Sequence, residues 1–423
     1  MNKLKKVVLS NFWPDQNAGD FAIFMAQIEI LNKEGVLDEN IHILSCYKGE
    51  SSISVNNFNH FTARGMKILP GLFPSLNKYG ELISKVEKVL QLLKILKFSI
   101  LCLFRSSKLL FMFSKGKTLR TLEAIEESDA VILKGGAFII GFPGIRGSVF
   151  LLRNIVLVWI SKTLGTKVII MPHSFGPFAN RFQKFMIRHI FNGVSIFSRE
   201  ELSYQTLEEL NLHSTIVPDL AFSWSALEQT AIKKKNKIAF TIRPLSSFKS
   251  EAEHRKYYSI FASSIEKLLE DGFEISLVPQ VTGPTIFEDD RVALKRVRAL
   301  LNPKWMNSAK LKVLPGLTIG GLIKEYSSCE TICGMRMHSV IFGLKLGCKV
   351  ISISYLGPKH KGIMRSLNLE KFHIDLENLC EQVLLRKIYQ AFSDQSVEEN
   401  KKRIGQFIDV TNERISKSLV RKN

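Results

Sequence analysis

The residues with the clearest chemical potential are an arginine and a histidine two positions apart, Arg336 and His338. They lie between an apolar run that predicts a strand and a run that predicts a helix. Backbone N–H groups at a helix start attract anions, and arginine can hold a phosphate or carboxylate with two parallel hydrogen bonds. Histidine can exchange a proton near neutral pH. The pair therefore indicates an anion site with an acid–base group, although an isolated pair of this kind is more often a capping histidine beside a surface arginine.

Other polar and glycine residues also follow predicted strands or open the next helix. Each has a plain structural alternative as a helix cap or a turn. The glycine-bearing loops lack the GxGxxG spacing of a dinucleotide site and the GxxxxGK[ST] spacing of a P-loop. These candidates are Asn17, Gly19, Asp20, Lys134, Gly135, Gly136, Ser174, Arg199 and Asp219.

Metal binding has little support in the sequence. The six cysteines are scattered without the paired spacing of zinc ligands. The acidic run Glu288-Asp289-Asp290 offers carboxylates for a metal, but three consecutive acids without further ligands more often begin a solvated loop. We therefore expect no metal and no cofactor. The first residues do not form a signal peptide, so we expect a cytoplasmic protein with reduced thiols.

The elements that must position these residues alternate between short apolar runs and helical stretches, which predicts parallel sheets with βα crossovers. In such sheets ligands bind beyond the carboxyl ends of the strands. A polar break near 223–236 divides the pattern, so we expect domains at 1–225 and 226–423. Two Rossmann-like domains facing a central cleft describe the GT-B architecture. The predicted strands are 6–10, 41–45, 130–133, 167–171, 193–197, 214–217, 238–242, 274–279, 331–333 and 349–354, and the clearest helices are 21–33, 257–271 and 337–346.

The charge balance is unusual, with a formal net charge of +20 over 423 residues. It indicates an anionic partner: a phosphorylated substrate, nucleic acid or an acidic membrane surface. The segment 89–104 is apolar but carries two lysines, and it is shorter than the roughly 20 apolar residues of a membrane span. It is either a buried packing helix or a basic amphipathic helix lying on anionic lipid.

Taken together, the motifs resemble those of the polysaccharide pyruvyl transferases. The last two motifs of the series are specific and the glycine-bearing ones are not. Two departures are Met337, where many relatives have leucine, and a long apolar insert around 70–120. The matching motifs are NAGD (17–20), KGGA (134–137), PHSFGPF (172–178), SRE (198–200), PDLAF (218–222), RMHSVIFGLKLG (336–347) and ISYLGPKHKGIM (353–364).

The resemblance implies a GT-B-like enzyme that uses phosphoenolpyruvate to place a ketal-linked pyruvate on a sugar of a surface polysaccharide, with release of phosphate. Arg199, Arg336 and His338 would face the donor, with His338 as the general acid. Asn17, Gly19 and Asp20 would line the acceptor side, and Asp20 or Asp219 could act as the base. The remaining predicted substrate-binding residues are Lys134, Gly135, Gly136, Ser174, Asp219, Ser339 and Lys359.

The expected partners are phosphoenolpyruvate, a sugar, lipid-linked oligosaccharide or polysaccharide acceptor, and an anionic membrane surface, but no nucleic acid. Two alternatives stay open. One is a sugar-nucleotide glycosyltransferase on the same architecture, because fold does not fix function. The other is a basic scaffold protein, for which clustering of lysines on one face would be the sign.

Overall fold

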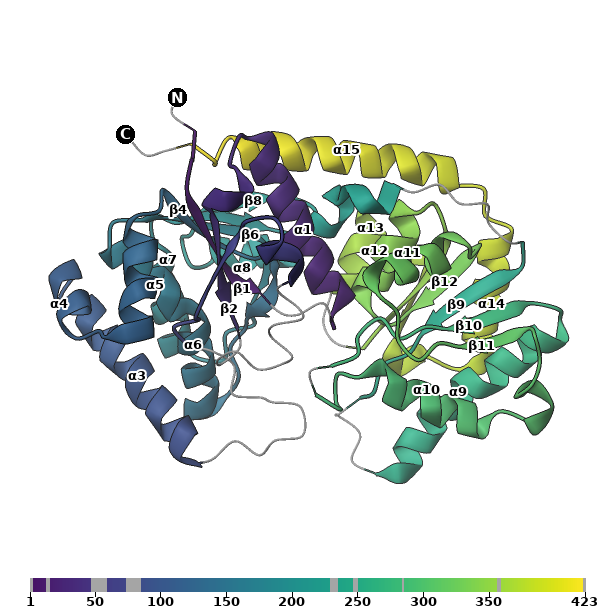
Figure 1. Ribbon diagram of the computed structural model, residues 1–423. Helices are drawn as coiled ribbons and strands as arrows, with labels where there is room; N and C mark the ends of the chain where they lie inside the picture. Colours follow the sequence, from purple (N-terminus) through teal and green to yellow (C-terminus); the bar gives the residue numbers. More distant parts are fainter. Residues whose placement is uncertain are drawn as a thin grey trace. The chain divides into compact units, whose positions relative to one another are not determined.

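Two parallel β-sheets organise the chain, and each belongs to its own unit of the fold (Figure 1). The computed structural model describes residues 3–12, 16–46, 59–73, 85–228, 235–245, 250–283, 285–355 and 359–420. Unit 1 comprises residues 1–14, 20–223 and 409–423, and unit 2 comprises residues 15–19 and 224–408. The α/β class with two parallel sheets agrees with the prediction.

The sheet of unit 1 has the strand order β3-β2-β1-β4-β6-β7-β8, and β5 pairs with β6. Helices join most consecutive strands, as parallel pairing requires, whereas only two residues separate β4 from β5, which do not pair with each other. The strands are β1 (Val7–Phe12), β2 (Ile41–Ser45), β3 (Lys67–Leu69), β4 (Ala130–Leu133), β5 (Gly136–Ile139), β6 (Lys167–Phe175), β7 (Ser195–Ser198) and β8 (Thr215–Ile216). The helices are α1 (Ala18–Lys33), α3 (Lys85–Leu103), α4 (Ser107–Met112), α5 (Gly116–Glu126), α6 (Gly144–Thr163), α7 (Arg181–Phe191) and α8 (Glu201–Glu208).

The sheet of unit 2 has the strand order β11-β10-β9-β12-β13-β14. Its strands are β9 (Lys237–Thr241), β10 (Glu274–Leu277), β11 (Leu311–Val313), β12 (Thr331–Gly334), β13 (Lys349–Ser354) and β14 (His373–Asp375). Its helices are α9 (Glu251–Glu270), α10 (Asp290–Leu300), α11 (Ile319–Ser327), α12 (Met337–Lys345), α13 (Lys359–Ser366) and α14 (Glu381–Phe392), followed by α15 (Val397–Ser416). Residues 16–19 add to this unit through an antiparallel bridge between Asn17 and Val281.

Each apolar run that predicted a strand overlaps an observed one, whereas the short strands β3, β5, β11 and β14 were not predicted. The end of β6 was placed wrongly. It extends to Phe175 rather than stopping at Met171, because β5 pairs with the added residues, with Gly136 opposite His173. His173 and Ser174 therefore lie within the strand and not in a loop after it.

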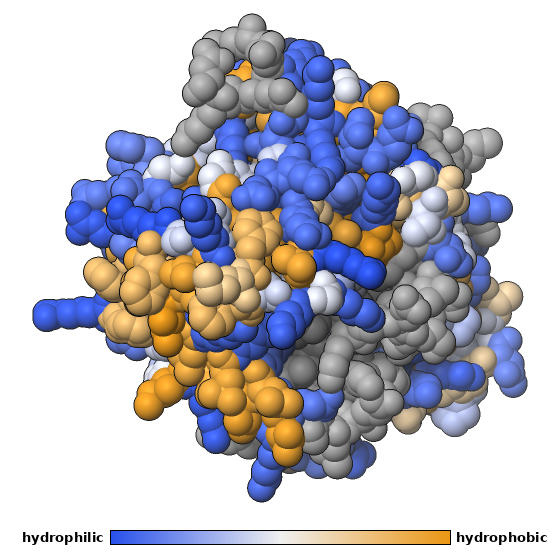
Figure 2. Space-filling view, turned by 60° about the vertical axis from the view of Figure 1, so that its left-hand side comes forward, coloured by the Kyte–Doolittle hydropathy of each residue, from blue (hydrophilic) through white to orange (hydrophobic). Residues whose placement is uncertain are grey.

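Helix α3 has one buried and one exposed apolar face. Phe98 and Cys102 are buried on the side that packs on α6, whereas Leu93 and Ile100 are 56% and 54% exposed. Figure 2 shows apolar side chains gathered on this side of the molecule, where α3 and α4 lie in Figure 1. The prediction of a buried packing helix is therefore correct for one face of α3. The other face of the helix is exposed.

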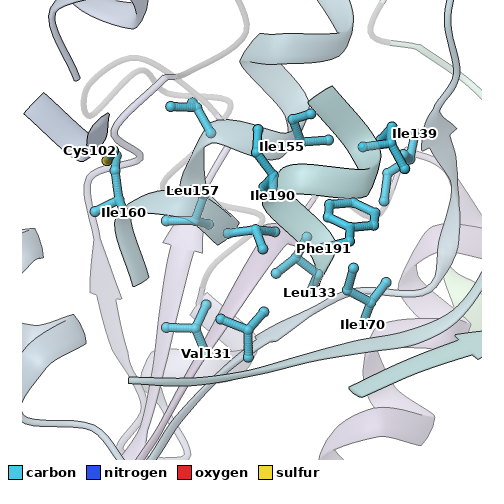
Figure 3. Close-up of a cluster of buried hydrophobic side chains, with 14 of the residues drawn as sticks. Cys102, Val131, Leu133, Ile139, Ile155, Leu157, Ile160, Ile170, Ile190 and Phe191 are labelled. Carbon is cyan, nitrogen blue, oxygen red and sulfur yellow. The ribbon is translucent and has the colours of Figure 1, made fainter. Parts of the chain in front are cut away.

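The core of unit 1 lies between the sheet and the helices α3, α5, α6 and α7. Figure 3 shows Ile155 and Ile160 of α6 close to Val131 of β4 and Ile190 of α7. Within the described residues, α6 is the one helix long and apolar enough to cross a membrane by length and composition alone. Its buried face packs into this core, which accounts for much of its apolar sequence.

Candidate functional site

In unit 2, Arg336 lies at the carboxyl end of β12 and is the N-cap residue of α12. Its Nε and Nη2 atoms donate to Oδ1 of Asp290 at 2.9 and 2.7 Å, and Nη2 also donates to the carbonyl of Glu288 at 2.6 Å. The side chain is 13% exposed. The guanidinium is thus held in one orientation and still reaches the surface.

Asp290 was not a predicted site residue, and the expectation that its acidic run begins a solvated loop is wrong for it. The residue is completely buried, and its Oδ2 accepts hydrogen bonds from the backbone N–H groups of Gln280 and Val281 at 3.0 and 2.9 Å. Burial raises the pKa of the Asp290 carboxyl, and Arg336 acts in the opposite direction. Because charge runs usually lie in solvent, the sequence alone did not reveal this partner.

A second arginine that the sequence did not single out, Arg243, follows β9. Its guanidinium stacks on the ring of Tyr355 at 3.8 Å from the centroid, and its Nε donates to the carbonyl of Pro244 at 3.2 Å. Burial lowers the pKa of Arg243, and the neighbouring positive charge of Arg336 lowers it further. Among the described residues no carboxylate forms an ion pair with it. An anion bound here would therefore stabilise its charged form.

His338 lies in the first turn of α12, and its position depends on Gly19. A Cβ atom at Gly19 would lie 2.0 Å from Nδ1 of His338, so only glycine fits there. Oδ1 of Asn17 accepts a hydrogen bond from the N–H of Gly19 at 3.2 Å. Asn17 and Gly19, predicted on the acceptor side, thus group with Arg336 and His338 in unit 2.

Ser339 is buried and joins α12 to the end of β9. Its Oγ lies 2.8 Å from Oγ1 of Thr241 and donates to the carbonyl of Arg336 at 2.6 Å. Ser339 therefore holds the backbone of Arg336 at the start of α12. Lys359 is the first residue of α13, and its side chain lies outside the described part of the structure.

In unit 1, Asp20 and Lys134 form an ion pair at the carboxyl end of β4. Lys134 is 1% exposed, whereas the side chain of Asp20 is 21% exposed. The two glycines that follow have backbone roles. A Cβ at Gly135 would lie 2.6 Å from the carbonyl oxygen of Pro172, and Gly136 has a φ of 154° where β5 begins.

Ser174, Arg199 and Asp219 meet at the carboxyl ends of β6, β7 and β8. Arg199 donates from Nη1 to Oδ2 of Asp219 at 2.6 Å and from Nε to Oγ of Ser174 at 2.7 Å. Asp219 also accepts from the N–H of Ala221 at 3.0 Å. The side chains of Arg199 and Asp219 are 4% and 1% exposed, so this pair is closed to solvent. The N-cap residue of α8 is Glu200, whose side chain accepts a hydrogen bond from the N–H of Ser203.

His173, also missed from the sequence, is buried beside this group. Its Nε2 accepts from the N–H of Phe138 at 3.2 Å, so its Nδ1 is the atom that donates to the carbonyl of Ser174 at 2.6 Å. The N–H of Arg199 donates to the carbonyl of His173 at 3.2 Å. The imidazole therefore joins β5 to β6, and the backbone carbonyl of His173 joins β6 to the end of β7.

A pocket opens at the carboxyl ends of β1 and β2 in unit 1. Nη2 of Arg153 donates to the carbonyl of Phe73 at 3.3 Å, while its buried Nε has no hydrogen-bond partner among the described residues. Burial raises the pKa of the Cys46 thiol to about 11, so this thiol is protonated at neutral pH. The pocket can therefore offer Arg153 as a hydrogen-bond donor. Its polar and aromatic lining comprises Ser10, Asn11, Ser45, Cys46, Phe73, Arg153 and Asn154.

Residues 17–357 match the sequence model of a family described as polysaccharide pyruvyl transferase. The chain belongs to this family. The matched span contains Arg243 and Arg336 of unit 2. It also contains the two ion pairs of unit 1 described above, Asp20 with Lys134 and Arg199 with Asp219. Within the described residues no group of three or more His, Cys, Asp or Glu side chains could hold a metal ion. Family membership supports a role in the modification of polysaccharides.

Solved structures similar to this pyruvyl transferase family member share its fold at low sequence identity. A glycosyltransferase from Rickettsia africae has a TM-score of 0.56 and 13% identity, covering 99% of this chain and 100% of that one. HepE from Anabaena, in complex with UDP and glucose, has a TM-score of 0.54 and 9% identity, covering 98% and 99%. The UDP-GlcNAc 2-epimerase from Methanocaldococcus jannaschii has a TM-score of 0.53 and 11% identity, covering 96% and 98%. These likenesses establish the GT-B-like fold. No curated protein matches the sequence.

Proposed function

We propose that the protein transfers the pyruvyl group of phosphoenolpyruvate to a pair of hydroxyls on a sugar, forming a pyruvate ketal and releasing phosphate. The acceptor would be a surface polysaccharide, such as a capsule or exopolysaccharide, or its precursor. The observation that carries the proposal is the pair Arg243 and Arg336 with a single buried carboxylate, Asp290, between the two charges. This leaves a surplus positive charge at the carboxyl ends of β9 and β12.

Phosphoenolpyruvate carries a carboxylate and a phosphate, and two arginines suit two anionic groups. Asp290 orients Arg336, and the ring of Tyr355 supports Arg243. Both arginines would also stabilise the charge of the departing phosphate. The N-terminus of α12, where Arg336 is the cap, adds a favourable dipole for an anion.

In the proposed reaction a proton adds to the methylene carbon of phosphoenolpyruvate, which becomes a methyl group and leaves the neighbouring carbon cationic. Two sugar hydroxyls add to that carbon in turn, and the bond from carbon to the phosphate oxygen breaks. Of the two hydroxyl protons lost, one balances the proton gained by the methyl group and one leaves with the phosphate. His338 is our choice for the acid at the methylene carbon. No cofactor or metal is required.

For the acceptor we propose the polar groups at the strand ends of unit 1, where Arg153 and Asp20 offer a donor and a carboxylate. Both carboxylates are ion-paired, Asp20 with Lys134 and Asp219 with Arg199, but Asp20 suits the role of base better because its side chain is 21% exposed and that of Asp219 is 1% exposed. We place the reaction in the cytoplasm, because phosphoenolpyruvate is an intracellular metabolite.

The test is calorimetric binding of phosphoenolpyruvate to the wild type, to Arg243→Met and to the control Arg255→Met, an exposed arginine of unit 2. We expect the wild type and the control to bind alike. Loss of charge-assisted hydrogen bonds in Arg243→Met should weaken binding about tenfold or more. Phosphate release in the presence of a sugar acceptor would then establish the transfer.

Wild-type protein that binds UDP or a UDP-sugar but not phosphoenolpyruvate would overturn the proposal in favour of a glycosyltransferase. Equal affinity of Arg243→Met and the wild type would remove the arginine pair as the donor site.

A further inference from the structure

The positive charge of the chain is concentrated in one part of unit 1. Residues 85–199 contain 18 Lys and Arg against 5 Asp and Glu, so they hold +13 of the formal net charge of +20. No acidic residue occurs between 130 and 199, and none occurs between 88 and 122. About a quarter of the sequence thus provides most of the net charge.

The same region exposes an apolar face on α3, on the turn into α4 and at the end of α4. Its members are spaced three or four positions apart along α3, so they lie on one side of the helix. They are between 42% and 66% exposed, although residues of their type are usually buried. We call this set the α3–α4 apolar face: Val86, Val89, Leu90, Leu93, Leu96, Ile100, Leu103, Phe104, Met112 and Phe113.

Exposed cations border the α3–α4 apolar face. Lys97 donates to the carbonyl of Phe113, so its ammonium group lies at the edge of the apolar atoms. Figure 2 shows hydrophilic side chains around the apolar ones on this side of the molecule. Only one acidic residue, Glu87, occurs between 85 and 122. The exposed cations are Lys85, Lys88, Lys97, Arg105, Lys108, Lys115, Lys117 and Arg120.

The neighbouring helices repeat this combination. The starts of α6 and α7 are joined by a hydrogen bond from Gln183 to the carbonyl of Phe142, and α6 packs against both α3 and α7. Ile145 and Phe182 at these starts are 84% and 60% exposed. Arginines accompany them in the sequence, and no acid occurs in either start. The starts of α6 and α7 are therefore basic and apolar, like α3 and α4.

We propose that the α3–α4 apolar face binds the surface of a lipid bilayer with anionic headgroups. A helix with an apolar face and flanking cations lies in the interface with its apolar side chains among the acyl chains and its cations at the phosphates. A large apolar patch rimmed by charge is rare on a protein with no partner for it. The near absence of acidic residues around the face fits an anionic partner. Binding to a neutral protein would not require acidic residues to be absent.

The buried side of helix α3 adjoins the pocket of unit 1. Phe73, which lines that pocket, packs edge-on against Phe98 of α3 with ring centroids 5.8 Å apart. Bilayer binding by α3 would thus bring the pocket close to the membrane, where a lipid-carried acceptor is found. This last step rests on the proposed function, whereas bilayer binding itself does not.

The test is flotation with vesicles of phosphatidylcholine alone and of phosphatidylcholine mixed equally with phosphatidylglycerol, in the absence of phosphoenolpyruvate. The full chain should bind the anionic vesicles at least tenfold more tightly than the neutral ones, and added salt should weaken the binding. The triple variant Leu93→Ser, Ile100→Ser, Leu103→Ser should lose at least tenfold in affinity. Its matched control, Leu37→Ser, Leu202→Ser, Ile286→Ser, alters side chains of similar exposure elsewhere and should bind like the wild type.

Charge-reversal variants measure the contribution of the cations to vesicle binding separately from that of the apolar side chains. Lys88→Glu with Lys108→Glu should also weaken binding at least tenfold, while Arg255→Glu with Lys256→Glu in unit 2 should not. All four variants change exposed residues, and unchanged circular dichroism and melting temperature would show that they fold.

Three results would overturn the proposal. One is a wild type that does not float with anionic vesicles. A second is a triple serine variant that binds like its control, which would leave charge alone as the cause. The third is a wild type that forms a dimer in light scattering, with the triple variant a monomer and neither bound to vesicles; the face would then be an interface between copies of the chain.

Discussion

Each unit of the protein contains a buried arginine–aspartate pair at the carboxyl ends of its strands, and the two pairs differ in their surroundings. In unit 1, Arg199 and Asp219 are 2.6 Å apart, and the guanidinium also donates to the neutral hydroxyl of Ser174. In unit 2, Arg336 and Asp290 are 2.7 Å apart, and the neighbouring side chain is a second arginine, Arg243.

The two arginine–aspartate pairs differ in net charge and in exposure to solvent. The pair of unit 1 is neutral and closed to solvent, so its arginine has no remaining charge for a ligand. The pair of unit 2 carries a surplus positive charge, and Arg336 is 13% exposed. We infer that Arg199 is a positioning residue that joins β7 to the segment after β8, and that Arg336 and Arg243 bind the donor. In this chain, an arginine at the end of a strand therefore has a structural role in one unit and a proposed binding role in the other.

The largest expected effect is on folding, in Asp219→Ala. The variant leaves Arg199 charged, buried and unpaired, which costs about 3–5 kcal/mol of unfolding free energy. Urea unfolding followed by circular dichroism measures it, with the exposed Asp409→Ala as the control. A stable Asp219→Ala protein that has lost phosphoenolpyruvate binding would break the comparison, because the pair of unit 1 would then be a ligand site.

A second prediction concerns turnover and the position of His338. In Gly19→Ala the new methyl group would meet the imidazole ring, which must move away. A misplacement of about 1 Å can reduce the rate by about 10²-fold. We expect turnover to fall by about this factor while the dissociation constant of phosphoenolpyruvate changes little. Gly320→Ala, where a Cβ meets no atom within 4 Å, is the matched control. Unchanged turnover in Gly19→Ala would separate His338 from the chemistry.

The smallest expected effect is in Arg336→Lys. Lysine retains the positive charge beside Asp290, so the cost in stability should be well below that of Asp219→Ala. It cannot replace the planar donor set of arginine, and we expect phosphoenolpyruvate affinity to fall about tenfold. Calorimetry measures the affinity and thermal melting the stability. An affinity equal to that of the wild type would mean that Arg336 only holds Asp290 in place.

Much of the fold could be predicted because apolar runs of a strand's length, separated by helical patterns, are a local signal. The strands β2, β4 and β13 have the predicted ends. The extension of β6 was missed, because it depends on pairing with β5, whose sequence shows no strand pattern. The exposed face of α3 was left as one of two alternatives, since the apolar run alone does not show which side of the helix finds a neighbour.

The sequence by itself determined the parallel α/β organisation, the family and the strand-end location of Arg336, Arg199 and Lys134. These follow from local periodicity and from motifs in a fixed order. Tertiary structure alone decided which partner each charged group has. It buried Asp290 against Arg336, brought Arg243 beside it, and set Gly19 against His338. Ion pairing and close packing join residues far apart in the chain, so no local pattern of residue types encodes them.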